Sequence, residues 1–317
     1  GILVWLINQL GWQELLNNLE KIGWWGGAII ILSLIWNICH TLAWRSILTF
    51  LGHPLPVFQL FRLKLIAEAI NQVAPSANLG GDTARAYLLK DEVPLSDALP
   101  SVMIDKTVDY FTKMIFNVVG LSVSIFFITI PTAWLWGCVV YLIIILVLNF
   151  LWIGFQVKGL SGSILAFAKL VPPLARFLQS KKTQMEMLDH NLKRSYTEGR
   201  KSLYIAGFWH TVGRTLGVLE VMLITWLLEV PVSFPEAFFF ITVVNVIKGV
   251  FFLIPGQVGV EEGSQAMVLE VLGYKAEIGL GVGVVRRIRK LVLTGLGLMF
   301  FAGYKGNKDF MEKGEKS

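Results

Sequence analysis

The sequence predicts an all-α polytopic membrane protein: two inverted-topology halves, each with a Pro/Gly-broken re-entrant hairpin, around a central cavity. Three observations carry this prediction. Of the 317 residues, 55% are hydrophobic and only 16% are charged, whereas charged residues make up about a quarter of a soluble domain. The apolar residues form runs of about 20 or more, which suffice to cross a hydrocarbon core of roughly 30 Å. Two passages rich in Pro and Gly, Asn71–Arg85 and Pro255–Gly263, interrupt these runs.

The long apolar runs predict the membrane crossings. Before them, either Ile2–Leu10 is expected to be the end of a longer apolar segment from an upstream helix, or Ile2–Leu19 is expected to lie along the interface. The crossings are expected over Trp24–Leu51, Val108–Ile130, Trp134–Phe155, Leu203–Leu228 and Glu277–Tyr304. Several glycines of the last crossing predict close helix packing: Gly279, Gly281, Gly283, Gly295 and Gly297.

Shorter helices flank the two broken passages. Val57–Val73 is amphipathic and leads into the first break, after which we expect a short helix over Thr83–Lys90. The proline and glycine residues of both passages are expected to end the helices there, because neither residue favours the interior of a helix. The remaining short helices are expected over Asp97–Met103, Phe238–Ile254 and Ser264–Leu272.

Lysine and arginine residues place the loops relative to the membrane. Nine lie in the linker 156–201 and four in the tail 305–317. Short loops rich in these residues stay on the cytoplasmic side, so both segments are expected to be cytoplasmic and to attract anionic lipids. This topology explains the formal charge of +6, and no nucleic-acid partner is expected.

Counting crossings indicates an inverted repeat within a single transmembrane domain over 1–317. Two long spans lie between the cytoplasmic linker and the tail, so Phe238–Leu272 must enter and leave by one face as a re-entrant hairpin. The same count makes Val57–Lys90 a hairpin that opens from the opposite face. The half-repeats 24–155 and 202–304 then have the architecture of many transporters. Equivalent positions are evenly spaced, with 180 residues from Pro75 to Pro255 and from Lys106 to Arg286, and 179 from Asp82 to Glu261.

Charged residues inside apolar spans mark the candidate site. A charge at the centre of a membrane helix costs roughly 2.5–3.5 kcal/mol, so these side chains should face water, one another or a ligand. The helix N-terminus after Gly81 would offer peptide N–H groups to a phosphate, and Arg85 would add a bidentate contact. The candidate substrate-binding residues are Asn71, Pro75, Gly80, Gly81, Asp82, Arg85, Asp105, Lys106, Asp109, Lys248, Pro255, Gly259, Glu261, Glu262, Arg286, Arg287 and Arg289.

Structural roles stay open for several of these residues. Asp82 would either cap the short helix and pair with Arg85, or contribute to a ligand site. The basic cluster Arg286–Lys290 would either form an ion-pair network with the acids or line the path of an anionic substrate. His210 and Arg214 form a second tier, in which His210 is expected to hydrogen-bond Ser, Thr or backbone groups rather than to relay protons. No metal ligands and no cofactor are expected.

The sequence contains few signatures of an enzyme. The sequence has no Walker motif, no His-Glu-x-x-His and no nucleophile elbow. Glu261 and Glu262 are similar to the Glu-Glu-x-x-x-Arg of intramembrane prenyl-protein proteases, but position 266 is Ala. An enzyme acting on polyprenyl-phosphate-linked sugars would use acids at the membrane edge, such as Asp82 and Asp105. We therefore expect no enzyme and keep this class as an alternative.

Two motifs carry a resemblance to a known family. Asn-Gln-Val-Ala-Pro at 71–75 precedes Gly-Gly-Asp-Thr-Ala-Arg at 80–85, and Phe-Leu-Ile-Pro-Gly-Gln-Val-Gly-Val-Glu-Glu-Gly follows at 252–263. Together they resemble the transmembrane region of lysylphosphatidylglycerol synthases, a flippase-like family, over essentially the whole chain. The family usually has Asp-Arg where this chain has Asp105-Lys106, which keeps the charge but loses bidentate geometry. The aminoacyl-transferase domain of the synthases is expected to be absent, so lysyl transfer is not expected.

The resemblance implies movement of a lipid across the membrane. The expected cargo is an anionic or phosphate-bearing lipid, such as a phospholipid, a hopanoid or a polyprenyl-linked lipid, whose phosphate would contact Arg85 and the basic cluster Arg286–Lys290. A non-catalytic partner of a lipid synthase is a further alternative. The expected location is a bacterial or archaeal cytoplasmic membrane, and homo-oligomerisation stays open. Without an ATP site, movement would run downhill or be coupled to an ion gradient.

Overall fold

The computed structural model describes residues 22–73, 79–159, 182–251, 257 and 259–304. Within these ranges the chain is all-helical, with ten helices and no strand, which confirms the all-α part of the prediction. Pro75, Pro255, the segment Ile2–Leu19 and the tail 305–317 lie outside the described residues. The helices are α3 (Trp25–Phe50), α4 (Val57–Val73), α5 (Leu79–Leu88), α6 (Leu95–Phe127), α7 (Thr132–Lys158), α10 (Lys182–Thr197), α11 (Arg200–Leu227), α12 (Phe234–Val250), α13 (Val260–Val271) and α14 (Ala276–Ala302).

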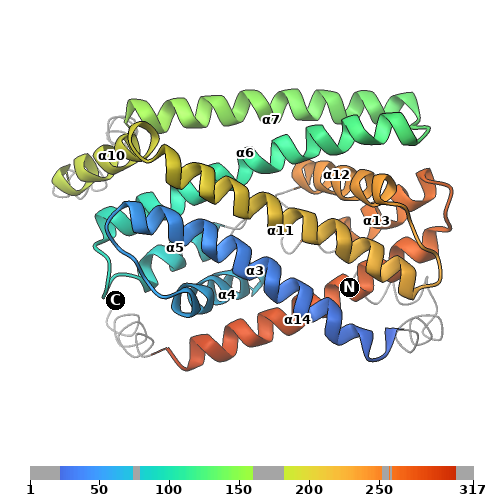
Figure 1. The fold of residues 1–317 in the computed structure, drawn as a ribbon, viewed down its shortest axis with the longest axis horizontal. Helices are drawn as coiled ribbons and strands as arrows, with labels where there is room; N and C mark the ends of the chain where they lie inside the picture. Colours follow the sequence, from blue (N-terminus) through green and yellow to red (C-terminus); the bar gives the residue numbers. More distant parts are fainter. Residues whose placement is uncertain (1–21, 74–78, 160–181, 252–256, 258, 305–317) are drawn as a thin grey trace.

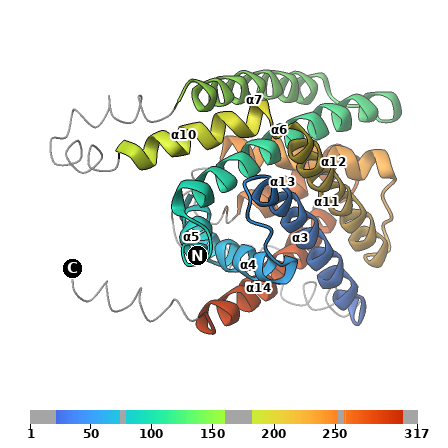
Figure 2. The same ribbon diagram turned by 60° about the vertical axis from the view of Figure 1, so that its left-hand side comes forward.

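The long helices run roughly along the longest axis of the molecule (Figure 1). Helices α3 and α11 pack against each other in the middle, and α6 packs against both. Helix α7 lies on one flank and α14 on the opposite flank in both views (Figures 1 and 2). The short helices fill the space between them, because α4 packs on α5 and α14, while α13 packs on α12 and α14.

Three helices among the described residues are long and apolar enough to cross a membrane, namely α3, α6 and α7. Helix α7 gives the clearest indication of the environment of the protein, because many of its apolar side chains are exposed on the surface. A soluble protein rarely exposes so large an apolar face, and together with the long apolar helices it indicates an integral membrane protein. The exposed side chains of α7 include Ile143, Ile144, Val147, Leu148 and Leu151.

Helix α6 is continuous over 33 residues, where the sequence predicted a short helix followed by a separate crossing. Pro100 lies inside it and cannot donate a hydrogen bond to the carbonyl of Ser96. Asn191 on α10 fills this gap, because its Nδ2 donates to the Ser96 carbonyl at 3.1 Å. The helix therefore continues past the proline, and Asp105 and Asp109 lie in its middle instead of at its start.

Helix α5 begins at Leu79, earlier than the predicted Thr83, so Gly80 and Gly81 lie in its first turn. The backbone N–H of Gly81 donates to Asn71 Oδ1 on α4 at 2.7 Å. A Cβ at position 81 would overlap the carbonyl oxygen of Ala67. Glycine thus allows α5 to lie directly on the backbone of α4.

The glycines of α14 confirm close helix packing at some positions and not at others. A Cβ at Gly297 would overlap the carbonyl oxygen of Leu65 and come within 2.8 Å of Ala69 Cβ, whereas a Cβ at Gly295 would meet nothing within 4 Å. Gly279 likewise lies against the backbone of α13 at Ala266. The close approach of α14 to α4 therefore requires glycine at position 297 and does not require it at position 295.

We expect Gly297→Ala to destabilise the protein by about 1–3 kcal/mol, because the added methyl group forces α4 and α14 apart. Gly295→Ala on the same helix is the matched control. It should be neutral or stabilising by up to about 1 kcal/mol, since alanine favours a helix. Thermal unfolding in detergent, followed by circular dichroism, measures both variants. Equal melting temperatures for the two would contradict the packing described here.

Candidate functional site

One face of α6 carries a polar stripe through the middle of the molecule. Asp105, Asp109, Lys113 and Asn117 follow one another at four-residue spacing, which places them on the same side of the helix. Asp105 is only 3% exposed and Asn117 is buried as well. At the far end of the stripe Asn245 Nδ2 on α12 donates to Asn117 Oδ1 at 3.4 Å. The stripe therefore extends from α3, α5 and α11 to α12.

Two ion pairs fix one end of the stripe. Arg85 Nη2 on α5 donates to Asp105 Oδ2 at 2.6 Å, and both side chains are about 5% exposed. The Arg85 guanidinium also lies 3.9 Å from the centre of the Trp44 ring on α3. Arg214 Nη2 on α11 donates to Asp109 Oδ1 and to the Asp109 carbonyl, both at 2.6 Å. Because water is largely excluded, each charge depends on its partner.

Asp82 pairs with α6 rather than with its own helix. Its Oδ2 lies 3.2 Å from Lys106 Nζ, so the predicted alternative of an Asp82–Arg85 pair is not what the structure contains. This pair is more exposed to solvent than Arg85–Asp105, since the Lys106 side chain is 30% exposed and the Asp82 side chain is 20% exposed. We call Asp82, Arg85, Asp105, Lys106, Asp109 and Arg214, together with His40 and His210, the α6 cluster.

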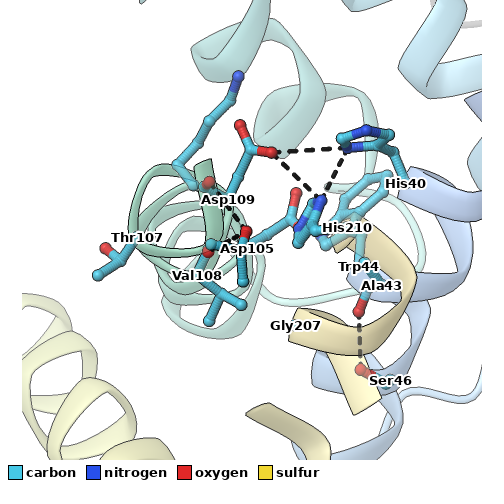
Figure 3. Close-up of polar contacts among 12 residues, drawn as sticks. His40, Ala43, Trp44, Ser46, Asp105, Thr107, Val108, Asp109, Gly207 and His210 are labelled. Carbon is cyan, nitrogen blue, oxygen red and sulfur yellow. Dashed lines mark hydrogen bonds and ion pairs between the residues drawn. The ribbon is translucent and has the colours of Figure 1, made fainter. Parts of the chain in front are cut away.

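The two histidines of this cluster form a direct pair (Figure 3). His40 Nδ1 on α3 lies 2.7 Å from His210 Nδ1 on α11, and His210 Nε2 lies 3.1 Å from Asp105 Oδ1. Asp109 Oδ1 lies 3.3 Å from His210 Nδ1. The partners of His210 are thus a second histidine and two carboxylates, instead of the Ser, Thr or backbone groups expected from the sequence.

His40 Nδ1, His210 Nδ1 and Asp109 Oδ1 lie within 4.8 Å of one another, a spacing that one cation could bridge. Arg214, however, already donates to the same Asp109 oxygen. Each carboxylate of the α6 cluster is also neutralised by a basic partner, so a divalent ion would add a double positive charge without compensation. Charge balance therefore disfavours a metal at this position.

A second cluster joins α14 to α11, α12 and α13. Glu220 on α11 accepts from Arg289 and lies 3.4 Å from Arg286 Nε. Glu261 on α13 accepts from Lys248 at 3.1 Å and from Lys290. Arg287 pairs with Glu262, and Arg289 lies 5.4 Å from the Trp36 ring centre on α3. We call Glu220, Lys248, Glu261, Glu262, Arg286, Arg287, Arg289 and Lys290 the α14 cluster.

Lys113 lies between the two clusters and has no ion-pair partner within the described residues. It interacts electrostatically with Arg214, Asp109 and Lys106 of the α6 cluster and with Lys248 of the α14 cluster. Together with Lys113, the two clusters contain nine basic side chains and six acidic ones, an excess of three positive charges. The neighbouring Lys64–Glu68 pair on α4 leaves this balance unchanged. The basic residues are Arg85, Lys106, Lys113, Arg214, Lys248, Arg286, Arg287, Arg289 and Lys290, and the acidic ones Asp82, Asp105, Asp109, Glu220, Glu261 and Glu262.

The structure brings most of the predicted charged residues together but separates the predicted backbone positions. Asn71, Gly80 and Gly81 lie where α4 meets α5, and the N–H of Gly81 is taken by Asn71. Gly259 precedes α13 with a φ of +81°, and its N–H donates to Glu262 Oε2 at 2.9 Å. These positions shape the short helices, while the charged side chains face the long ones.

Three residues of the site were missed from the sequence as candidates. Lys113 continues the four-residue spacing of Asp105 and Asp109, so this spacing could have identified Lys113 as a residue on the same face of the helix. Glu220 was recognisable as an acid inside an apolar span. His40 gives no comparable signal, because it meets His210 only through the packing of α3 on α11.

A cavity of about 500 Å³ lies on the other side of α5. Its walls are largely apolar and come from α4, α5 and the end of α14, including Ile70, Ala84, Leu88, Phe301 and Tyr304. Arg85 and Asp82 on the same helix face α6. Helix α5 thus separates an apolar cavity from the charged clusters.

Comparisons with known proteins agree with a membrane protein. Residues 1–297 match the family described as the lysylphosphatidylglycerol synthase TM region. A UPF0104 membrane protein of Methanocaldococcus jannaschii is 30% identical over 81 residues, which cover 25% of this chain and 24% of that protein. The match thus spans about a quarter of the length of this relative. No solved structure matches the chain.

Proposed function

The chain belongs to the family of the lysylphosphatidylglycerol synthase TM region, and we propose that it transports an anionic lipid, whose headgroup carries a phosphate, across the membrane. The observation that carries the proposal is the excess of three positive charges over the two clusters and Lys113. Unbalanced charges are expensive inside a membrane and mark the path of a substrate. A phosphate-bearing phospholipid, hopanoid or polyprenyl-linked lipid would supply the missing negative charge.

Lys113 is the first contact that we assign to the phosphate. It is partly buried, and within the described residues no carboxylate lies within ion-pair distance of it. Arg85, by contrast, already pairs with Asp105 and lies against the Trp44 ring, although its Nε has no hydrogen-bond partner within the described residues. We therefore move the centre of the proposed site from Arg85 to Lys113, with Lys248 and Arg287 on the side of α14.

The acyl chains require an apolar environment beside this site. The cavity between α4, α5 and α14 provides about 500 Å³ with largely apolar walls, to which Lys90 and Asp91 also contribute, within the range of small-molecule sites. In the proposed path the headgroup passes along the α6 stripe while a chain occupies this cavity or remains in the bilayer.

We also propose that the two halves are inverted repeats and that α4–α5 and α12–α13 are their re-entrant hairpins. Asp82 on α5 pairs with Lys106 on α6, as Glu262 on α13 pairs with Arg287 on α14. The two acids are 180 residues apart and the two bases 181. Equivalent pairs in both halves support alternating access around one site, with the linker 156–201 and the tail 305–317 in the cytoplasm.

Reconstitution of the full chain into liposomes tests the transporter directly. We expect headgroup-labelled phosphatidylglycerol to cross the bilayer faster than in protein-free liposomes, and faster than labelled phosphatidylcholine, because only the anionic headgroup neutralises the site. Equal rates with and without the protein would contradict the proposal. Turnover of a lipid-linked sugar donor without lipid movement would assign the chain to the membrane enzymes instead.

A further inference from the structure

Hydrogen-bond geometry determines where the protons of the His40–His210 pair lie. The Asp105 carboxylate, paired with Arg85, can only accept, so His210 Nε2 donates its hydrogen to it. In the state in which both rings are neutral, His210 Nδ1 is bare and accepts from His40 Nδ1, while the nearby Asp109 Oδ1 accepts from Arg214. This leaves His40 Nε2 without a hydrogen, and that atom is buried and has no hydrogen-bond partner within the described residues. His40 Nε2 is therefore the position at which the pair can take up one more proton.

Charged groups surround the pair on every helix packed against it, and they are balanced in the immediate neighbourhood. On α6 and α5, Asp105 is matched by Arg85 and Asp82 by Lys106. On α11, Arg214 matches Asp109, and on α4 Lys64 matches Glu68. On α14, Arg289 reaches Trp36, whose ring lies against that of His40 at 5.6 Å. Outside these pairs, the α14 cluster and Lys113 carry the excess of three positive charges.

We propose that the His40–His210 pair is the binding site of a proton that accompanies the anionic lipid, an inference that rests on the proposed function. In the empty protein the positive excess opposes a further positive charge on His40. A bound phosphate offsets that excess, so His40 Nε2 then takes a proton from water and forms an N–H bond. The resulting imidazolium has Asp109 Oδ1 at 3.6 Å from its Nδ1.

Lipid and proton then strengthen the binding of each other by the same factor. If one proton is taken up per lipid, the affinity for the anionic lipid falls about tenfold for each pH unit of increase. A proton gradient would consequently move the lipid against its own gradient. The proposal thus names the coupling ion of the transporter.

Calorimetric titration with dioctanoyl-phosphatidylglycerol, in buffers of different ionisation enthalpy, counts the protons taken up by the full chain in detergent. We expect uptake approaching one proton per lipid and the tenfold dependence of Kd on pH, in the range of about pH 5 to 8 where imidazoles titrate. His40→Gln and His210→Gln should bind the lipid with a nearly pH-independent Kd. His53→Gln, which removes an imidazole paired with Asp97 away from the cluster, should behave as the wild type.

A second measurement uses the wild-type protein, so it does not require that the histidine variants fold. The chain has four histidines, so ¹⁵N spectra of the histidine-labelled protein resolve each ring. We expect a coupling between two Nδ1 atoms in the free protein and conversion of one ring to imidazolium on addition of the lipid. Lipid binding without proton uptake, or uptake unchanged in His40→Gln, would overturn the proton site alone. Absence of lipid binding would overturn the transporter as well, and stoichiometric Zn²⁺ binding lost in His40→Gln would assign the pair to a metal.

Discussion

Asp105→Ala is expected to destabilise the fold by about 3–5 kcal/mol, the cost of leaving one member of a buried ion pair without its partner. Asp105 is the carboxylate to which both Arg85 and His210 donate. Once it is removed, the Arg85 guanidinium stays 5% exposed next to Trp44 with no carboxylate to neutralise it. Thermal unfolding in detergent gives the loss of stability directly.

Two comparisons separate the ion pair from a general loss of packing. The double variant Arg85→Met with Asp105→Leu should recover part of the loss, because apolar residues replace a buried pair at little cost, while the His210 Nε2–H group still lacks its acceptor. Asp82→Ala should cost no more than about 1 kcal/mol, since the Asp82–Lys106 pair is partly open to solvent. If the double variant is as unstable as Asp105→Ala, the Arg85–Asp105 pair is not the unit that stabilises this region.

Lys113→Gln is expected to lower the rate of phosphatidylglycerol transport about 10- to 100-fold at low lipid concentration. A hydrogen bond to a charged group contributes about 1.5–3 kcal/mol, and each 1.4 kcal/mol corresponds to about tenfold in affinity. Stability should change little, because Lys113 has no ion-pair partner among the described residues. The liposome assay measures the rate, and unfolding in detergent provides the check on stability.

The conservative and the distant variants make this prediction specific. Lys113→Arg keeps the charge and should retain most of the transport. Lys275→Gln removes a lysine that is exposed just before α14, and it should leave the rate unchanged. A wild-type rate in Lys113→Gln would show that this lysine does not contact the substrate.

The helical class and the apolar spans were predictable because they depend on local composition. The continuity of α6 was not, since it depends on Asn191, which lies 95 residues away in the sequence from the carbonyl that it satisfies. The early start of α5 depends in the same way on Asn71 of the neighbouring helix. Where a side chain from another helix hydrogen-bonds a backbone N–H or C=O group, proline and glycine no longer predict where a helix ends.

The charged residues of the site were largely predictable, but their partners were not. A charge in an apolar span is conspicuous in any sequence, and this principle singled out Arg286 and Arg289, which the structure buries among acidic partners. Pairing is a tertiary property, as the contact of His40 with His210 across 170 residues illustrates. The distinction between the cations that have an ion-pair partner and Lys113, which has none among the described residues, therefore required the structure.

The selectivity of lipid binding tests the central claim most directly, namely that the positive excess of the interior binds an anionic headgroup. Titration of the wild type with dioctanoyl-phosphatidylglycerol and with dioctanoyl-phosphatidylcholine gives the ratio of the two Kd values. The charge balance predicts tighter binding of phosphatidylglycerol, a ratio that falls towards one in Lys113→Gln and stays at the wild-type value in Lys275→Gln. Equal Kd values for the two lipids in the wild type would contradict the claim.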